Sequence, residues 1–359
     1  RNPGPNPGGR TIYVYRHTRI IDLQSVWRPP DSSKSFPRNI SVVPVADESF
    51  GVRSMCTYIE TPDVKILVDP AASLGPRFAL PPHPSEYRAL RESRSRIEKL
   101  ADQAEVITIS HYHFDHATPT FTDYIWNWSN LDAARRIYEE KLVLAKDIQN
   151  RINPSQRRRG WMLQKVAGDF MKEIRPADGK VFEFGNTQLK FSEPVFHGED
   201  AALGWVLMLS VSYGDEKVMH ASDVQGPISE ETLKIITAAA PNLVLIGGPP
   251  SYLSGFSVEE KTILMGLKNL ARLVESIPIT IVAHHLLRDE GWRALSKGVF
   301  DTAENTEHRV VTAMEFIDKP TNLLESKRPK LYESDPPPEL FIKWTKLQEE
   351  KRRETIPPL

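Results

Sequence analysis

The sequence predicts an α/β protein, a four-layer αββα sandwich in which two mixed β-sheets pack face to face and helices cover the outer faces. Three observations predict this class. Short β-branched runs open the body of the chain, helix and strand patterns alternate after them, and the same succession then occurs a second time. The compact spacing of these segments indicates one domain over residues 39–318.

The two ends of the chain differ in composition from this body. Residues 1–38 are rich in Pro, Gly, Ser and Arg, which predicts an extended N-terminal arm. Residues 319–359 are rich in Pro and Lys and predict a C-terminal tail that packs on the domain. Such ends could also wrap a neighbouring copy of the chain in a homo-oligomer.

The first half of the body predicts four strands and a helix. The helix is expected at Pro84–Ala104, where Leu90, Ile97 and Leu100 mark an apolar stripe and Pro84 suits a first turn. Residues 120–180 are expected to be mostly helical. The strands are expected at Ile40–Val45, Met55–Glu60, Lys65–Asp69 and Glu105–Ile109.

The second half returns to strands and then alternates with helices. The helices are expected at Pro227–Ala240, from Ser257 with a capping box, and at Glu304–Ile317. The strands are expected at Val181–Phe184, Thr187–Phe191, Gly204–Tyr213, Lys217–His220, Leu243–Ile246 and Ile279–Ala283.

The composition excludes some partners and compartments. The 359 residues carry 46 Lys and Arg against 47 Asp and Glu, so no overall field recruits nucleic acid or an anionic membrane. The one cysteine, Cys56, allows neither an internal disulfide nor a cysteine-based zinc site, and we expect it to be a small buried residue. No run approaches the about 20 apolar residues of a membrane span. Residues 1–9 lack the apolar core of a signal peptide, so the cytoplasm is the expected location.

The most informative stretch is Ser110–His116, which reads H-x-H-x-D-H from its second residue and directly follows an apolar strand. On an extended backbone alternate side chains share a face, so His111, His113 and Asp115 can point the same way. His116 reaches the same space once the chain turns. Neutral imidazole and carboxylate are the usual ligands of zinc and similar ions. The pattern therefore predicts a metal site at the end of this strand.

H-x-H-x-D-H after a strand is the signature of the metallo-β-lactamase superfamily, which the chain resembles over about residues 39–318. The remaining positions of the superfamily pattern occur in the same order, each after an apolar run. They are Asp69, His197, Asp223 and then His284 or His285. The resemblance implies the metallo-β-lactamase fold and a metal-dependent reaction.

Several shorter strings resemble a little-characterised, largely archaeal branch of that superfamily. They are Ser49–Ser54 (SFGVRS), Ser110–His113 (SHYH), Ser155–Arg159 (SQRRR), Gly247–Pro250 (GGPP) and Trp344–Leu347 (WTKL).

The superfamily resemblance implies two divalent ions per chain, with zinc the expected metal and manganese or iron the alternatives. The implied ligands are His111, His113 and His197 for the first ion, Asp115, His116 and the last histidine for the second, and Asp223 between them. Two such ions, about 3.5–4 Å apart, share a hydroxide that attacks the substrate. Asp115 would also orient this nucleophile or pass a proton to the leaving group.

The sequence identifies the last ligand and the supporting residues less directly. His284 is favoured over His285 because it stands one residue past the apolar run, where related sequences place the ligand. The two would point to opposite sides if the strand continued through them. Asp69 is expected to hold an imidazole or the motif loop by hydrogen bonds, with a plain strand-end cap as the alternative. His220, three residues before Asp223, is expected to be a supporting or core histidine and not a ligand.

Candidates for substrate contact lie outside the ligand set. Arg157, with Arg158 and Arg159, could grip a phosphate or another anion, or could be a solvated helix start. Tyr112 and Ser222 are neighbours of ligands and are weaker candidates. The Gly247–Pro250 segment follows a strand and is a candidate rim loop near the metals.

These residues predict a metal-dependent hydrolase that cleaves an ester-type bond, a phosphodiester or a lactone, in a small molecule. Where His113 stands, the di-iron redox branch of the superfamily usually carries a carboxylate, which favours hydrolysis here. One alternative is a nuclease acting on RNA or DNA. This alternative is supported by basic stretches at Arg157–Arg159, Lys327–Lys330 and Lys351–Arg353. The other is a metal-binding scaffold or sensor without turnover. No membrane partner is expected.

Overall fold

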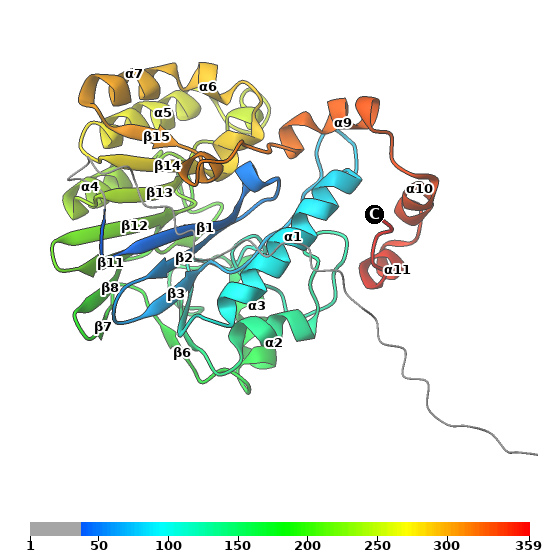
Figure 1. Ribbon diagram of the computed structural model, residues 1–359, viewed down its shortest axis with the longest axis horizontal. Helices are drawn as coiled ribbons and strands as arrows, with labels where there is room; N and C mark the ends of the chain where they lie inside the picture. The colour runs from blue at the N-terminus through cyan, green and yellow to red at the C-terminus, as the bar shows by residue number, and fades with distance from the viewer. Residues whose placement is uncertain (1–36) are drawn as a thin grey trace, which may run out of the picture. The chain divides into compact units, whose positions relative to one another are not determined.

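The structure, a computed structural model, describes residues 37–359. The N-terminal arm expected over residues 1–38 therefore lies outside the described residues, apart from its last two. The described chain is built on two large sheets (Figure 1).

The first sheet has six strands whose spatial order follows the chain. They are β1 (Ser41–Asp47), β2 (Met55–Glu60), β3 (Lys65–Val68), β4 (Val106–Ile109), β5 (Leu142–Ala145) and β6 (Glu173–Pro176). β1 to β3 pair antiparallel, whereas β3 to β6 pair parallel. Because β3 and β4 run the same way, the residues that follow them lie at the same edge of the sheet.

The second sheet has seven strands, and their spatial order follows the chain except between β11 and β8, which are neighbours without being consecutive. In spatial order they are β15 (Arg309–Val311), β14 (Ile279–Ala283), β13 (Leu243–Gly247), β12 (Glu216–Ser222), β11 (Leu209–Tyr213), β8 (Thr187–Phe191) and β7 (Val181–Phe184). β12 to β15 are parallel, so helical crossovers connect them. The strand expected at Gly204–Tyr213 is split: β10 (Trp205–Val206) pairs with β9 (Val195–Phe196) outside this sheet, and β11 lies within it.

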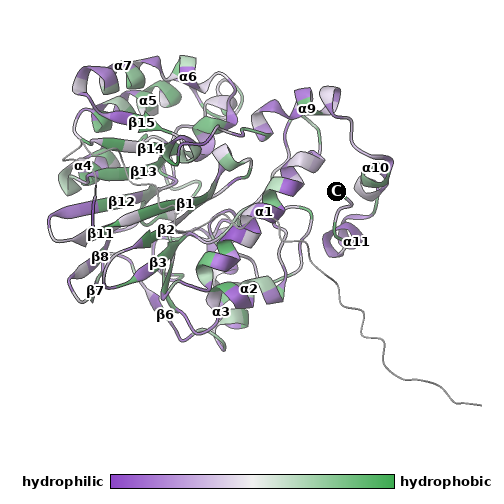
Figure 2. Cartoon of the chain, in the orientation of Figure 1, coloured by the Kyte–Doolittle hydropathy of each residue, from purple (hydrophilic) through white to green (hydrophobic). Residues whose placement is uncertain are grey.

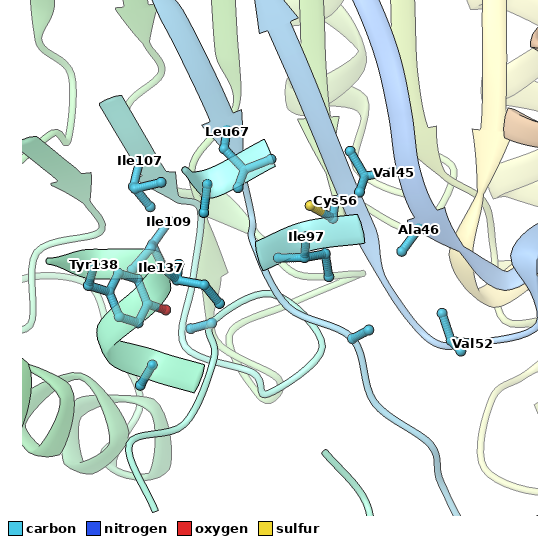
Figure 3. Close-up of a cluster of buried hydrophobic side chains, with 14 of the residues drawn as sticks. Val45, Ala46, Val52, Cys56, Leu67, Ile97, Ile107, Ile109, Ile137 and Tyr138 are labelled. Atoms are coloured by element: carbon cyan, nitrogen blue, oxygen red, sulfur yellow. The ribbon is translucent and has the colours of Figure 1, made fainter. Parts of the chain in front are cut away.

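Helices cover the outer faces of both sheets, as Figure 1 shows. On the first sheet, α1 (Pro84–Ala101), α2 (Leu131–Tyr138) and α3 (Pro154–Ala167) enclose an apolar cluster that includes Leu67 and Ile107 (Figure 3). On the second, α4 (Glu230–Ala239), α5 (Glu260–Val274) and α7 (Lys297–Thr306) enclose another. The predicted four-layer αββα arrangement is confirmed.

The helix α1 illustrates how the sequence specifies a covering layer. Its Leu90, Ile97 and Leu100 are buried, and Figure 2 shows hydrophobic and hydrophilic residues interspersed along it, as in an amphipathic helix. His83 caps it: its ring nitrogen accepts from the backbone N–H of Ser85, while the Glu86 carboxylate accepts from the backbone N–H of His83. The helix is shorter than the predicted Pro84–Ala104.

The prediction that residues 120–180 are mostly helical is wrong in two places. Besides α2 and α3, this segment contains β5 and β6, which extend the first sheet. The sequence of β5 is Leu-Val-Leu-Ala, and so short an apolar run has no period that separates strand from helix. β6 is largely exposed, and it is a strand because it pairs with β5.

Near α5 and after β14 the structure also differs from the predicted helices. The helix expected at Glu304–Ile317 is in fact the end of α7, the strand β15 and the short helix α8 (Ala313–Phe316). β15 is specified by its pairing with β14, which no local pattern reveals. The capping box expected from Ser257 is not formed, because α5 begins at Glu260 and Glu259 occupies its N-cap without a side-chain bond.

The C-terminal segment is helical and packs against α1. It forms α9 (Arg328–Ser334), α10 (Glu339–Thr345) and α11 (Glu349–Glu354). The rings of Phe341 and Trp344 lie 5.6 and 5.5 Å from that of Tyr87 on α1. Arg328 and Glu86 form a fully buried bidentate ion pair, with both N–O distances 2.8 Å. An aromatic contact and a buried ion pair therefore join this segment to α1.

Two expectations from composition concern single features. Cys56 is buried in β2 with a free thiol, as predicted. Over residues 37–359, no helix combines the length and the apolar composition that a membrane crossing needs.

The buried ion pair between Arg328 and Glu86 is open to test with Arg328→Met. Without the guanidinium, the Glu86 carboxylate stays buried and loses its counter-charge, so we expect the free energy of unfolding to fall by about 3–5 kcal/mol in urea denaturation. As a control, Arg135→Gln removes the half-exposed pair with Glu139 and should cost at most about 1 kcal/mol. Equal losses in the two variants would contradict the prediction.

Candidate metal centre

The candidate site lies where strands of both sheets end. Asp69 follows β3, the H-x-H-x-D-H loop follows β4, Asp223 follows β12 and His284 follows β14. Asp69, Ser222 and His284 have positive φ angles of 48°, 59° and 63°. The left-handed region is unfavourable for residues with a side chain, and residues held in it concentrate at functional sites.

The structure brings together the ligand candidates from the sequence. They form four overlapping groups, each with ligand atoms within 4.8 Å of one another: His111, His113 and His197; Asp69, His111 and His116; Asp115, His116 and His284; and Asp223, His284 and His285. We call these residues the His/Asp cluster. Most of their side chains are buried, and Asp115 remains 16% exposed.

Hydrogen bonds fix which ring nitrogen of two histidines faces the cluster. The Ser110 hydroxyl donates to Asp69 Oδ2 at 2.6 Å, so it can only accept from His111 Nδ1, which lies 2.9 Å away. Asp69 Oδ2 also accepts from His116 Nδ1 at 2.8 Å. His111 and His116 therefore carry their protons on Nδ1 and present Nε2 lone pairs to the cluster.

Asp223 lies at the centre of the cluster. Its Oδ2 is 3.1 Å from the Nε2 atoms of His197, His284 and His285. Gly247, at the end of β13, lies directly behind it: a Cβ at that position would be 3.0 Å from Asp223 Oδ1. The Gly247–Pro250 segment, expected as a rim loop, therefore begins against the central carboxylate.

Within residues 37–359, three buried polar atoms of the cluster have no hydrogen-bond partner: Nε2 of His116, Nε2 of His197 and Oδ1 of Asp223. His197 Nε2 is near Asp223 Oδ2 but is not aligned for a hydrogen bond. Leaving a buried polar atom unpaired costs about 1–3 kcal/mol, and such atoms often mark an ion or water. Imidazole nitrogen and carboxylate oxygen are donors that zinc prefers. The residues present therefore fit a metal centre.

Two residues that support the cluster were missed from the sequence. Glu48, in the 3-10 turn η1 (Glu48–Phe50), places Oε1 3.1 Å from His284 Nδ1. Arg288, at the end of the turn η3 (His284–Arg288), donates to the same oxygen at 2.8 Å, and both side chains are 3% exposed. Arg288 Nη2 also lies 3.7 Å from Asp115 Oδ2. Glu48 directly precedes the Ser49–Ser54 string, the one signal that pointed to this segment.

Burial and mutual proximity determine the protonation of the cluster. Burial, and after it the neighbouring imidazoles, lower the pKa of His111 well below its usual value and that of His113 to about 3. Burial alone would raise the pKa of Asp115 and Asp223, but the surrounding histidines outweigh it and lower both. Both carboxylates are therefore ionised at neutral pH.

His284 is the exception among the histidines. Burial favours its neutral form, but the charges of Asp223 and Glu48 outweigh burial and raise the pKa of His284 to about 10. A ligating imidazole must be neutral, so a divalent ion at His284 would displace a proton.

Asp69 belongs to one of the four groups, whereas His220 lies outside them. The backbone N–H of Ser110 donates to Asp69 Oδ1 at 2.7 Å, so Asp69 contacts both the motif loop and, through Oδ2, an imidazole. His220 lies between the sheets with Nε2 2.9 Å from the backbone oxygen of Met55, and it belongs to none of the four groups.

The three weaker candidates for substrate contact have other partners. Tyr112 is 1% exposed, and its hydroxyl donates to a backbone carbonyl at 2.5 Å. Ser222 is fully buried and donates to the Ser110 hydroxyl at 2.8 Å. Arg157 is exposed, but its guanidinium donates to two backbone carbonyls at 3.1 and 3.4 Å. Each of these polar groups therefore has a partner within the fold, and substrate contact at these residues stays a prediction.

The strand β14 does not continue through His284 and His285. The left-handed φ of His284 starts η3, so both side chains reach Asp223 instead of pointing to opposite sides. Arg288 approaches both rings, with Nη2 3.2 Å from His284 Nδ1 and Nη1 3.2 Å from His285 Nδ1. The two histidines differ in that His284 Nε2 also lies 3.5 Å from Asp115 Oδ2. A ring nitrogen that accepts from arginine has no proton, so His285 carries its proton on Nε2 and donates it to Asp223 at 3.1 Å.

Sequence comparison finds archaeal relatives over most of the chain. A UPF0282 protein of Methanopyrus kandleri is 44% identical over 292 residues, covering 81% of this chain and 98% of the relative. A UPF0282 protein of Methanocaldococcus jannaschii is 40% identical over 304 residues, covering 84% of this chain and all of the relative. No family model matches the chain. The archaeal branch expected from the short strings is confirmed.

Solved structures with a similar arrangement share little sequence with the chain. The metallo-β-lactamase fold protein YhfI from Bacillus subtilis has a TM-score of 0.44 and 12% identity, covering 75% of this chain and 90% of that chain. Unliganded yeast PDE1 has a TM-score of 0.45 and 14% identity, covering 76% and 97%. The short form of human tRNase Z has a TM-score of 0.37 and 11% identity, covering 68% and 92%. Likenesses at this level say nothing about the reaction.

Glu48→Gln tests the support that Glu48 gives to His284. A carboxylate that accepts from a ligating imidazole orients it and raises its basicity, so we expect the affinity for zinc to fall about 10- to 100-fold in competition with a chromophoric chelator. Glu60→Gln, at a half-exposed position away from the cluster, serves as the control and should leave the affinity unchanged. Wild-type affinity in the Glu48 variant would show that this carboxylate does not support the site.

Proposed function

The chain belongs to the UPF0282 family, and from the geometry of its His/Asp cluster we propose that it is a metal-dependent hydrolase. The proposal is carried by the convergence of imidazoles and carboxylates on one buried space, with ring nitrogens of His116 and His197 and an oxygen of Asp223 unpartnered. This donor set supports two divalent ions, zinc first and manganese or iron as alternatives.

The ligands follow the grouping of the side chains. We propose His111, His113 and His197 for one ion, Asp115, His116 and His284 for the other, and Asp223 between them. His284 is preferred to His285 because its Nε2 approaches Asp115 as well as Asp223, whereas His285 approaches Asp223, Tyr252 and Arg288. His285 would then hold the central carboxylate in place.

The residues of the chain complement what the ions supply. Bound divalent ions would activate water as a nucleophile and stabilise the negative charge that develops on the substrate. Asp115 is an ionised carboxylate at the open side of the cluster, so its Oδ2 can take a proton from the attacking water and pass it to the leaving group. Arg288, buried against Glu48, keeps a positive charge 3.7 Å from Asp115 and so favours its ionised form.

The substrate we propose is a small molecule with an ester-type bond, a phosphodiester or a lactone. The nuclease alternative depends on basic stretches that could follow a phosphate backbone. In the structure Arg328 is buried against Glu86, and Arg353 pairs with Glu349 at 2.6 Å and approaches Asp123 at 3.3 Å. Two of the three stretches are therefore partly neutralised within the fold, which supports the small molecule.

A panel of substrates separates these functions. We expect zinc- or manganese-loaded protein to hydrolyse bis(p-nitrophenyl) phosphate or a homoserine lactone faster than an RNA oligomer, measured as initial rates at equal enzyme concentration. Preferential cleavage of the RNA would support the nuclease. Absence of turnover on all three with each metal supplied would support a scaffold or sensor.

His113→Ala tests whether the cluster holds the metal and performs the reaction. Loss of one first-ion ligand should reduce both metal content and turnover, with the rate falling at least about 100-fold. The control is His308→Ala, since His308 belongs to none of the groups and only bonds a backbone carbonyl. Elemental analysis and rates are measured on the same preparations. Two ions per chain with normal turnover in the His113 variant would refute the ligand assignment.

A further inference from the structure

The loop that carries the H-x-H-x-D-H motif has two faces. His111, His113 and Asp115 turn into the His/Asp cluster, whereas the alternate residues Tyr112 and Phe114 line a separate cavity of about 510 Å³. That volume is in the range of sites that hold small organic ligands, about 300–1,000 Å³. None of the residues around this cavity is used by the proposed reaction.

The walls of the cavity are apolar and aromatic. Phe114 and Phe121 pack edge to face with ring centroids 5.5 Å apart, and Met162 of α3 lies among the lining residues. Phe121 is 40% exposed and Met162 39%, so large apolar side chains here remain in contact with water. Covering them with the flat face of a ligand would remove that contact.

Two arginines of α3, Arg158 and Arg159, complete the lining. The guanidinium of Arg159 lies 4.5 Å from the ring centre of Phe114 and donates to the backbone oxygen of Tyr112 at 3.5 Å. Over residues 37–359, neither arginine forms an ion pair with a carboxylate, whereas Arg135 of the neighbouring α2 pairs with Glu139 at 2.8 Å. The charge of Asp115 acts on Arg159 without an ion pair between the two. Two arginines free of ion pairs at one apolar cavity are suited to an anion.

We propose that this cavity binds a small organic anion, with a planar apolar body against Phe114 and Phe121 and its phosphate or carboxylate held by Arg158 and Arg159. The inference goes beyond the proposed function. Because Phe114 stands between two proposed ligands in the chain, an anion bound here would lie against the loop that carries them. The sequence pointed to Arg157 together with Arg158 and Arg159. The structure turns Arg157 to backbone carbonyls and leaves its two neighbours at the cavity.

The test is calorimetric titration of the metal-loaded full chain with phenylphosphonate, which has the ring and the anion but no ester to cleave. We expect methylphosphonate, which lacks the ring, and benzyl alcohol, which lacks the anion, to bind about tenfold more weakly or worse. Benzoate distinguishes the anions: affinity equal to that of phenylphosphonate indicates a carboxylate site, and weaker affinity a phosphate site.

Variants assign the binding to the cavity. The double variant R158Q/R159Q should weaken phenylphosphonate about tenfold or more, because both guanidinium contacts are lost. Lys165→Gln removes an exposed cation from the same helix, where Lys165 lies over Trp161, and should leave the affinity unchanged. Phe121→Ala should weaken phenylphosphonate and leave methylphosphonate unaffected, since only the ring contact is lost.

The outcomes separate this inference from the proposed function. Unchanged phenylphosphonate affinity in the double variant, or equal affinity of wild type for phenylphosphonate and methylphosphonate, would overturn it. None of the substituted residues is a proposed ligand, so the metal content of every variant should match wild type. Arginine-dependent binding by a chain that takes up no divalent ion would contradict the proposed function alone. Normal metal content and hydrolysis with unchanged phenylphosphonate binding in the double variant would contradict only the proposed anion binding in the cavity.

Discussion

The arrangement of the site depends on one buried carboxylate, that of Asp69. It accepts three hydrogen bonds: from the backbone N–H of Ser110, from the Ser110 hydroxyl and from His116 Nδ1. These bonds tie the start of the motif loop to the end of β3, and through the Ser110 hydroxyl they also determine the proton position on His111. A fully buried carboxylate needs such donors to remain ionised. The loop therefore keeps Asp69 ionised, and Asp69 holds the loop in place.

A second requirement is charge balance in a buried space. The imidazoles of the cluster lie close to one another, and burial keeps His111 and His113 neutral, with the pKa of His113 at about 3. Asp223 and Asp115 remain ionised because histidines surround them. Behind His284, Arg288 and Glu48 form an ion pair that has no net charge. Unpartnered nitrogens and an ionised carboxylate in one small volume favour a bound cation over an empty site.

The fold provides these contacts by bringing the strand ends of two sheets to one edge. Asp69 and the motif loop come from the first sheet, Asp223 and His284 from the second, and Glu48 reaches the cluster from the turn after β1. Left-handed backbone at Asp69, Ser222 and His284 redirects side chains that a regular strand would point elsewhere. The motif loop then separates two environments, the polar cluster on one face and the apolar cavity with its arginines on the other.

By itself, the sequence predicted the two-sheet class and four residues of the cluster, because short apolar runs and the H-x-H-x-D-H spacing are local properties of the chain. The other ligand candidates, Asp69, His197, Asp223 and His284 or His285, were implied by the resemblance to the metallo-β-lactamase superfamily. Tertiary structure alone decided three things. β5 and β15 are strands because they pair with neighbours, and Glu48 supports His284 because two turns meet. The left-handed turn at His284 brings His284 and His285 to the same carboxylate. Strand pairing, long-range contacts and backbone strain depend on residues far apart in the chain, so no local pattern records them.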